Sequence, residues 1–560
     1  MRILIVGGVA GGASCAARAR RLSESAEIVI FDRGPYVSFA NCGLPYHVGK
    51  VIPDEEDLLV ATPELFRDRF NIEVRTLHNV RSIDRPKKTV EVENLETGEI
   101  YRESYDALVL SPGSEPLRPR LPGIDLPGIF TIWTIPDMRK IVQWIGRHHA
   151  RKAVVVGGGF IGLEMTENLK KLGMEVSIVE MQPHVMPVLD PEMGMIINEH
   201  LSASGVDLYL GSPVKGFERR SGGTSDAGIG VMLASGKTLP ADLVVLSIGV
   251  RPRSGLAESA GLEIGRSGGI RVDDRMRTSD SSIWAVGDAV EVKDYLTGDW
   301  ILVPLAGPAN RQGRITADVI LGVNEKSTRF RGVQATSVCG VLGLTIASTG
   351  KTERQLSLAG GPEPYEKIYL HPACHAGYYP GARPITIKLI FRPGDGRILG
   401  AQALGMEGVD KRIDVISMAI QKNSTVFDLE EAELCYAPQY GSAKDPVNMA
   451  GMIASNVLRG LARIQHWEQL TGDNAYLLDV RDPEEFEKGH IEGAVNIPLN
   501  SLRKRMGELP KDKEIAIHCY VGQRSYYAYR ILSQHGYRAK NLSGGYRTYP
   551  YVKKLYPEIP

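Results

Sequence analysis

Two cysteines in this sequence stand where a thiolate could act as a nucleophile. Cys42 begins a turn of small residues that leads into a helical stretch, and Cys519 follows the apolar stretch EIAIH and precedes another helical stretch. The positive end of a helix favours the thiolate, so the turn predicts a lowered pKa for Cys42. Because the thiolate is the form that attacks sulfur-sulfur bonds, the two cysteines predict redox or sulfur-transfer chemistry.

Cys42 has no second cysteine close to it in the chain. The six cysteines, at positions 15, 42, 339, 374, 435 and 519, are scattered over 560 residues. An internal disulfide within this segment is therefore not expected. The redox partner of Cys42 must be a substrate thiol, a persulfide sulfur, or oxygen that converts it to a sulfenic acid.

The segment around Cys519 predicts an anion-binding loop. In CYVGQRS, residues 519–525, successive backbone amides would surround the sulfur of Cys519. This segment resembles the active loop of rhodanese domains, and LLDVRDPEEFEKGHIEGAVNIPL is its usual companion stretch. Arg524 completes a Cys-x4-Arg spacing, whereas phosphatases of the same fold use Cys-x5-Arg, so sulfur transfer is favoured. Cys519 is expected to carry a persulfide, while Asp479 and Arg481 are expected to stabilise the fold.

Two stretches have the strand, turn, helix and strand order of a dinucleotide-binding unit, and the second is the more regular. Gly157, Gly159 and Gly162 follow the run AVVV and open a helical stretch, and Glu180 ends the next strand. The glycines would let the backbone approach a pyrophosphate, and Glu180 would bind a ribose 2′-hydroxyl and repel a 2′-phosphate. This pattern favours NADH over NADPH.

The first unit departs from the usual fingerprint, because Val9 occupies its middle position between two glycines. The stretch WAVGDAV, residues 284–290, resembles the second FAD motif of flavoproteins that bind two dinucleotides. We therefore expect FAD at the N-terminal unit. The residues expected to bind it are Gly7, Val9, Gly12, Asp32, Arg33 and Asp288.

The segment SFANCGLPY, residues 38–46, would run beside the flavin in such a fold. It closely resembles a motif of the coenzyme A disulfide reductase family, and the resemblance extends over residues 1–455. It implies that coenzyme A is a bound substrate or carrier, with its phosphates met by basic residues of the first helix, where Arg18, Arg20 and Arg21 cluster. The residues implied to contact coenzyme A are Ser14, Arg18, Arg21, Ser38, Asn41, Asn310 and Lys444.

Two further segments, YYPG at 378–381 and LCYAPQYGSAKDP at 434–446, also resemble segments of that family. In the family, two tyrosines from the partner subunit reach the reactive sulfur, which implies a homodimer. Tyr378 and Tyr436 are the best matches, with Tyr379 left open as the alternative to its neighbour. A tyrosine hydroxyl can hydrogen-bond or protonate a leaving thiolate.

Composition excludes several other classes of protein. Lys and Arg number 66 and Asp and Glu also 66, so there is no basic field to attract nucleic acid or an anionic membrane. No zinc or other metal pattern is present. Scattered cysteines suit a reducing compartment, and no run approaches the ~20 apolar residues of a membrane span. The first residues are interpreted as a strand and helix rather than a secretory signal, so a cytoplasmic location is expected.

The predicted fold class is α/β: two Rossmann-like dinucleotide-binding domains, an α+β dimerisation domain and a C-terminal α/β rhodanese domain. The predicted bounds are 1–112 with 251–325 for FAD, 113–250 for NAD(H), 331–455 for dimerisation and 462–560 for rhodanese.

The predicted function is NADH- and FAD-dependent reduction of coenzyme A persulfide or polysulfide, with release of sulfide, and of coenzyme A disulfide. Cys42 would react and the rhodanese domain would deliver sulfur, which favours persulfide or polysulfide. Whether Cys519 passes sulfur directly, through coenzyme A or between subunits stays open. Two alternatives remain: an NADH oxidase or peroxidase with a Cys42 sulfenic acid, and a redox protein whose rhodanese domain docks a client.

Overall fold

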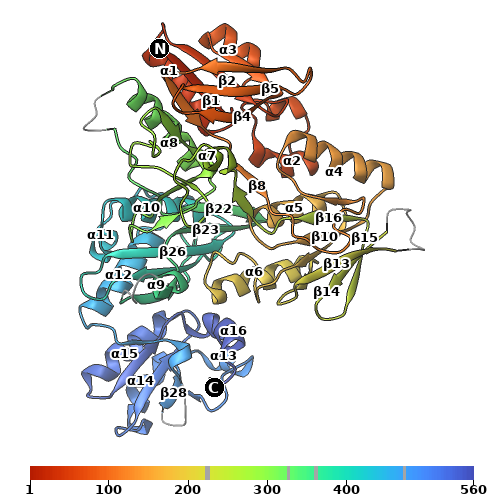
Figure 1. Ribbon diagram of the computed structural model, residues 1–560. Helices are drawn as coiled ribbons and strands as arrows, with labels where there is room; N and C mark the ends of the chain where they lie inside the picture. Colours follow the sequence, from red (N-terminus) through yellow and green to blue (C-terminus); the bar gives the residue numbers. More distant parts are fainter. Residues whose placement is uncertain (221–227, 324–327, 359–363, 471–474) are drawn as a thin grey trace. The chain divides into compact units, whose positions relative to one another are not determined.

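The computed structural model describes residues 1–220, 228–323, 328–358, 364–470 and 475–560 (Figure 1). The chain divides into a first unit, residues 1–181 with 206–335, and a second unit, residues 182–205 with 336–560. Position 325, the predicted end of the FAD domain, lies outside the described residues. The four-domain bounds stay a prediction.

The first unit begins with a parallel sheet in the strand order β19-β7-β1-β2-β3. Its strands are β1 (Arg2–Val6), β2 (Glu27–Asp32), β3 (Glu73–Thr76), β7 (Ala107–Leu110) and β19 (Ile283–Ala285). The run Ile3 to Ile5 is fully buried, as expected of a parallel strand covered on both faces. Helix α1 (Gly11–Leu22) follows the first turn and packs against α8 (Ala306–Ile320).

A second parallel sheet of this unit has the order β12-β11-β10-β16-β9. Its strands are β9 (Ile129–Phe130), β10 (Lys152–Val156), β11 (Glu175–Val179), β12 (Asp207–Tyr209) and β16 (Leu243–Leu246). Helix α5 (Phe160–Lys171) begins directly after the glycines that follow β10. Both predicted Rossmann-like units are therefore present.

The second unit contains an antiparallel sheet in the order β22-β23-β26-β25-β24. Its strands are β22 (Ser337–Val341), β23 (Leu344–Gly350), β24 (Glu366–Leu370), β25 (Thr386–Phe391) and β26 (Ile398–Gly405). Helix α10 (Val409–Gln421) packs against β23 and β26, and α12 (Pro446–Leu458) packs against α11 (Val426–Glu430) and β24. This arrangement confirms the α+β prediction.

The C-terminal part of the second unit is a small parallel sheet in the order β27-β31-β30-β28-β29. Its strands are β27 (Ile464–Gln465), β28 (Ala475–Asp479), β29 (Val495–Asn496), β30 (Glu514–His518) and β31 (Ala539–Leu542). Among its helices are α13 (Pro483–Glu487), α15 (Gln523–Gln534) and α16 (Gly545–Leu555). The fold class predicted from the sequence is thus confirmed.

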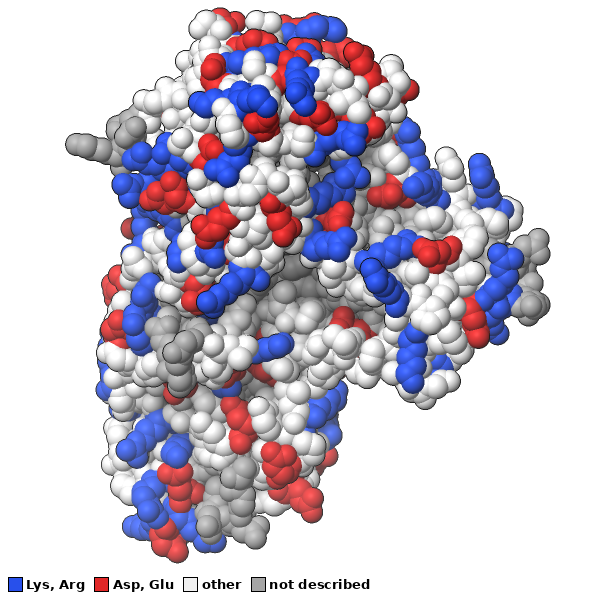
Figure 2. All heavy atoms as spheres, viewed as in Figure 1, with Lys and Arg blue, Asp and Glu red and all other residues white. Residues whose placement is uncertain are grey.

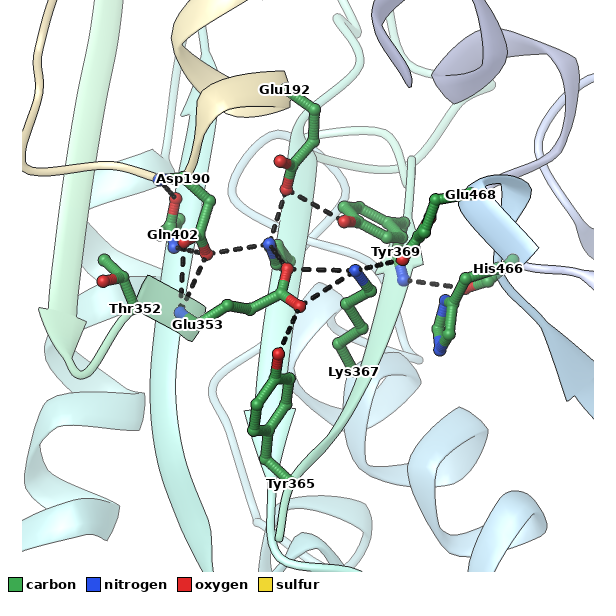
Figure 3. Close-up of polar contacts among 12 residues, drawn as sticks. Asp190, Glu192, Thr352, Glu353, Tyr365, Lys367, Tyr369, Gln402, His466 and Glu468 are labelled. Carbon is green, nitrogen blue, oxygen red and sulfur yellow. Dashed lines mark hydrogen bonds and ion pairs between the residues drawn. The ribbon is translucent and has the colours of Figure 1, made fainter. Parts of the chain in front are cut away.

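Within the second unit, the C-terminal sheet region covers β24, the edge strand of the antiparallel sheet. Tyr369 donates its backbone N–H to Ser543 Oγ at 3.2 Å, and Lys367 Nζ lies 2.6 Å from Glu468 Oε1. Figure 3 shows the Lys367 and Glu468 side chains pointing toward one another. An exposed edge strand offers unpaired backbone groups, and this contact satisfies one of them, the Tyr369 amide.

A fully buried lysine, Lys388, lies beside this contact, since it pairs with Glu353, as Lys367 does. Its ammonium group is 2.7 Å from Asp190 Oδ2 and 2.5 Å from Glu192 Oε1, and it also pairs with Glu353. Asp190 precedes helix α6 (Pro191–Ala203), so the lysine joins that helix to β25.

No helix in the described parts of the chain has the length and apolar composition to cross a bilayer.

Candidate active sites

Cys42 lies in a short 3₁₀ turn, Asn41–Gly43, that leads into α2 (Leu44–Val48). The side chain is exposed, and its thiol donates a weak hydrogen bond of 3.6 Å to Asn41 Oδ1. A Cβ atom on Gly43 would lie 2.7 Å from Leu58 Cδ2, so a larger residue at that place would require the Leu58 side chain to move. The predicted turn and helix are both present.

The pKa of the Cys42 thiol is raised, and the predicted lowering is therefore wrong. Loss of solvent around the sulfur is the largest cause, followed by the negative charges of Glu164 and Asp288. Helix α2 has five residues, and its weak dipole does not offset these effects. The thiolate of Cys42 thus needs local positive charge or a nearby proton acceptor to form readily at neutral pH.

Glu164 was missed by the sequence analysis. It lies on α5, two residues after Gly162, and accepts a hydrogen bond of 3.4 Å from Tyr46 OH. Burial raises the pKa of its carboxyl group to about 7. A carboxyl group that titrates near neutral pH can hold or release a proton beside Cys42. The signal in the sequence was an acid two residues after the last glycine of a nucleotide-binding fingerprint.

The second fingerprint has the shape that a dinucleotide requires. A Cβ atom on Gly162 would lie 2.0 Å from Gly157 O, so the helix can approach the strand only with glycine there. A Cβ on Gly159 would meet nothing within 4 Å, which leaves open space at the N-terminus of α5 for a pyrophosphate. Glu180 accepts a hydrogen bond of 2.8 Å from the Gly158 amide. The residues present fit NADH.

The first fingerprint has the same construction. Gly7 has a left-handed φ of +92°, and a Cβ there would lie 2.1 Å from Ser111 O. Asp32 accepts hydrogen bonds from the amides of Gly8, at 2.9 Å, and Gly34, at 2.8 Å. Burial raises the pKa of Asp32, and these two amides oppose the rise. The loop is held open for a nucleotide at the start of α1.

The remaining residues predicted for FAD lie at the edges of this loop. A Cβ on Gly12 would lie 1.9 Å from Gly7 O, while Val9 is half-buried and Arg33 is exposed. Asp288 follows β19 and accepts a hydrogen bond of 2.9 Å from Ser114 Oγ. Burial raises the pKa of the Asp288 carboxyl group. The donor and acceptor set fits a flavin dinucleotide.

Residues predicted to contact coenzyme A meet where α1 packs on α8. Ser14 Oγ donates to Asn310 Oδ1 at 2.5 Å, and Arg18 Nε lies 2.6 Å from Asp318 Oδ1. The guanidinium group of Arg18 is therefore already paired. Arg21 is exposed.

Arg20, in contrast, does not belong to a ligand-facing cluster. It is buried and donates hydrogen bonds to the backbone carbonyls of Phe70, Ser23, Glu24 and Asn71. The expectation that three arginines form one basic group is wrong, because α1 turns Arg20 toward the neighbouring loop. Arg20 stabilises the fold.

Ser38 and Asn41 lie in the Cys42 segment, as the motif requires. Ser38 is buried, has a φ of +48° and donates its amide to Gly8 O at 2.8 Å. The Cys42 segment is therefore tied directly to the turn of the first fingerprint. Lys444, in the second unit, is exposed.

Tyr378 and Tyr436 form a pair in the second unit, with hydroxyl oxygens 2.7 Å apart. Their exposed fractions are 75% and 48%. Tyr379 instead packs edge-on against His375, with ring centroids 5.7 Å apart. Tyr378, and not Tyr379, is therefore the hydrogen-bond partner of Tyr436, while the choice of which adjacent tyrosine serves the site stays a prediction.

Cys519 lies at the end of β30, fully buried in the loop before α15. Its sulfur accepts hydrogen bonds from the Gly522 amide at 3.2 Å and from Ser525 Oγ at 3.4 Å. Ser525 was not identified from the sequence. Both donors favour a negative charge on the sulfur.

Arg524 does not offer an unpaired positive charge to the sulfur of Cys519. Its guanidinium group binds Glu485 through two contacts of 2.6 and 2.8 Å and Asp482 through one of 3.1 Å. The arginine therefore ties the loop to α13. Asp479 and Arg481 form a buried ion pair of 2.7 Å, in keeping with the structural role expected of them.

Charged side chains of both signs lie side by side on the visible face in Figure 2, in keeping with the zero net charge.

Residues 1–313 match the family model of the pyridine nucleotide-disulphide oxidoreductases, and residues 336–445 match the dimerisation domain of that class. Residues 464–549 match a rhodanese-like domain. The chain belongs to the pyridine nucleotide-disulphide oxidoreductases, which are FAD-dependent and use a nicotinamide nucleotide.

Within this class the chain belongs to the coenzyme A disulfide reductase family, with a rhodanese-like domain added. It is 34% identical to the coenzyme A disulfide reductase of Staphylococcus haemolyticus over 456 residues, 81% of this chain and 100% of that protein.

Two solved structures are similar to the whole chain. The crystal structure of reduced Bacillus anthracis CoADR-RHD is 46% identical, with a TM-score of 0.95, covering 100% of this chain and 99% of that one. An NAD-dependent persulfide reductase from A. fulgidus is 38% identical, with a TM-score of 0.90, covering 98% and 100%. The predicted resemblance is confirmed.

Proposed function

We propose that this chain reduces coenzyme A persulfide, or a similar low-molecular persulfide or polysulfide, to sulfide and thiol with electrons from NADH, and that it also reduces coenzyme A disulfide. One observation carries the proposal: a single chain holds two free cysteines in built sites. Cys42 is exposed in a segment that is hydrogen-bonded to the first glycine turn, and the sulfur of Cys519 has two hydrogen-bond donors.

The chain's glycines and acids supply both nucleotide sites. FAD would be held by Gly7, Val9, Gly12, Asp32, Arg33 and Asp288, and NADH by Gly157, Gly159, Gly162 and Glu180. When bound, the flavin supplies two-electron transfer between the nicotinamide and the sulfur of Cys42. Asp32 and Glu180 orient their loops through glycine amides.

Cys42 performs the covalent step. Its thiolate attacks the sulfane sulfur of the persulfide, the sulfur-sulfur bond breaks, and the thiolate of the carrier leaves and takes up a proton. Two electrons and a proton then cleave the new Cys42 persulfide into sulfide and the cysteine thiolate. With coenzyme A disulfide, the same attack gives a mixed disulfide, and two electrons release the second thiol.

Other residues bind the substrate and supply the proton. Ser14, Arg18, Arg21, Ser38, Asn41, Asn310 and Lys444 would hold the coenzyme A arm. Arg18 must share its charge between Asp318 and a phosphate. Tyr378 and Tyr436 would protonate the leaving thiolate. Their exposure supports the proposal that they serve the partner subunit of a homodimer.

Cys519 would receive sulfur from a donor and hold it as a persulfide. The Gly522 amide and the Ser525 hydroxyl stabilise the anionic sulfur, and Arg524 fixes the loop that carries them. The domain bounds of the sequence analysis and a cytoplasmic location are part of this proposal.

The test compares the full-length Cys42→Ser and Cys519→Ala variants by NADH consumption. Cys42→Ser should abolish turnover of every substrate. Cys519→Ala should keep coenzyme A disulfide reduction and slow persulfide turnover when sulfur is supplied by a donor of the rhodanese domain. The proposal fails if Cys519→Ala leaves persulfide turnover unchanged with every donor while coenzyme A disulfide is much the better substrate.

Two other outcomes identify the alternatives. Consumption of hydrogen peroxide by the NADH-reduced protein without added thiol would identify a peroxidase that uses a Cys42 sulfenic acid. NADH oxidation that requires a protein acceptor would identify a redox partner protein.

A further inference from the structure

The loop that carries Tyr378 is closed at its base. It joins β24 to β25, and Cys374 and Arg383 face one another across it. The Cys374 amide donates to Arg383 O at 2.8 Å, and the Arg383 amide donates to Cys374 Sγ at 3.2 Å. Tyr378 lies near the middle of this loop, in a turn closed by the Tyr379 amide, which donates to Ala376 O at 2.9 Å.

The loop that carries Tyr436 joins α11 to α12 and ends at Asp445. The carboxylate of Asp445 caps α12 by accepting the Val447 amide at 3.0 Å. The two loops are joined by a backbone hydrogen bond of 2.8 Å from the Ala376 amide to Gly441 O. The bases of both loops therefore lie together, below the two tyrosines.

Arg412, on α10, binds both bases at once. Its exposed fraction is 1%. Nη2 donates to Cys374 O at 2.8 Å and to Asp445 Oδ2 at 2.9 Å, and Nε lies 3.3 Å from Asp445 Oδ1. One planar guanidinium group thus bridges a carbonyl of the first loop and a carboxylate of the second, which lysine cannot do with the same geometry.

A glycine beside Arg412 makes room for this group. A Cβ on Gly408 would lie 2.2 Å from Arg412 Nη1, and the Gly408 carbonyl accepts a hydrogen bond of 3.0 Å from the same atom. The Cβ position of Gly441 is 3.5 Å from Asp445 Oδ2. The surroundings therefore fit closely around an arginine that is paired with Asp445.

We infer that Arg412 is a positioning residue, which holds the two loops in the register that brings the hydroxyl groups of Tyr378 and Tyr436 together. Its catalytic consequence rests on the proposed function, in which the pair protonates the leaving thiolate. The inference that Arg412 positions the two tyrosines does not rest on the proposed function. Both tyrosines are largely exposed, so their contact depends on the loops that carry them.

The catalytic test uses Arg412→Lys in the full-length, flavin-loaded enzyme, with Tyr378→Phe in both backgrounds. Arg412→Lys keeps the charge and loses the bridge. It is expected to lower kcat for coenzyme A disulfide about tenfold at unchanged KM for NADH. Tyr378→Phe should lower kcat in the parent and have little further effect in Arg412→Lys. Independent, multiplying effects of the two substitutions would overturn the inference.

Arg392→Lys is the matched control. Arg392 pairs with Asp395 in the same antiparallel sheet, at 3.0 Å, in the hairpin between β25 and β26. Arg392 lies outside both tyrosine loops in the chain, so kcat should remain at the parent value. An equal loss in both variants would show a general effect of weakening the sheet and would also overturn the inference.

A second measurement tests position without catalysis. The hydrogen bond with Tyr436 raises the pKa of Tyr378. Fluorine NMR of the full chain labelled with 3-fluorotyrosine, assigned through Tyr378→Phe, can follow this titration. Tyr436→Phe should lower the pKa, and Arg412→Lys should lower it equally. An unchanged pKa in Arg412→Lys would overturn the inference, whereas parent-like kcat in both Tyr→Phe variants would overturn only the proposed proton donor.

Discussion

The Gly158 amide donates a hydrogen bond of 2.8 Å to a carboxylate oxygen of Glu180. The same relationship recurs in the first fingerprint, where the Gly8 amide donates to Asp32 at 2.9 Å. In both sites an acid at the end of the second strand is held against the glycine turn. In both units the acid therefore fixes the glycine turn that precedes the helix.

Replacing Glu180 by Gln should reduce the preference for NADH. The variant keeps an acceptor for Gly158 and removes the negative charge that repels a 2′-phosphate. We expect kcat/KM for NADPH to rise about tenfold and that for NADH to fall, measured by initial rates. Asp207→Asn, on the neighbouring strand β12, is the control. An unchanged ratio would show that another residue selects the nucleotide.

Replacing Glu164 by Gln should make Cys42 more reactive. The pKa of Glu164 is about 7, so above that pH its charge raises the pKa of the nearby thiol. In the NADH-reduced enzyme, alkylation of Cys42 by iodoacetamide should reach its midpoint at lower pH in the variant, with about two- to tenfold faster labelling at pH 8. Mass spectrometry of the Cys42 peptide measures this.

Glu175→Gln is the control for that experiment, because Glu175 is exposed at the start of β11 and pairs with Lys152. Coincident pH profiles for the Glu164→Gln variant and the parent would assign the raised pKa of Cys42 to desolvation and Asp288 alone.

Replacing Ser525 by Ala should slow sulfur loading of Cys519. The hydroxyl group is one of the two donors on the sulfur, and its loss is worth about 1 to 2 kcal/mol, or five- to thirtyfold. Persulfide formation on Cys519, followed by mass spectrometry after mixing with a sulfur donor, measures the rate. Ser533→Ala, at the other end of α15, should load at the parent rate. Equal rates in all three proteins would leave the Gly522 amide as the relevant donor.

Glu353 should contribute pH-dependent stability to the second unit. Burial by itself would raise its pKa, but Lys388 and Lys367 lower the pKa from 4.5 to about 2. A carboxyl group with a depressed folded-state pKa stabilises the fold fully above 4.5 and loses that contribution as the pH falls toward 2. The change corresponds to about 3 kcal/mol, at about 1.4 kcal/mol for each pH unit.

Urea unfolding followed by hydrogen exchange of peptides from β24 to β26 measures this contribution. Between pH 5 and 3, the parent should lose more stability than Glu353→Gln, in which the site no longer titrates. Parallel loss in both proteins would place the acid sensitivity elsewhere, for example at Glu366, whose pKa is lowered against the effect of burial by a hydrogen bond from His466.

Periodicity and turn chemistry made much of the fold predictable. The run RILIV became β1, AVVV became the end of β10, and the glycines after each strand opened α1 and α5 as expected. These elements depend on local rules, because a parallel strand and a nucleotide turn carry their own residue types. The rhodanese-like loop was predictable for the same reason.

What the sequence did not reveal depends on tertiary neighbours. The raised pKa of Cys42 comes from burial and from carboxylates more than a hundred residues away in the chain. The pairing of Arg18 with Asp318 likewise joins two distant helices. Lys388 in a strand pattern would suggest an exposed position, yet it is fully buried among three carboxylates from two segments of the chain. Spacing along the chain carries no information on such contacts.

The C-terminal region also has a structural role, because it contacts the edge strand β24. Without residues 462–560, the β24 edge would present open amides and carbonyls to solvent, and Lys367 would lose its contact with Glu468. A shortened protein would thus have an exposed edge strand of the kind that promotes association between β-sheets. The rhodanese-like domain therefore also shields part of the β24 edge, and its removal would expose the Tyr369 amide and the Lys367 ammonium group.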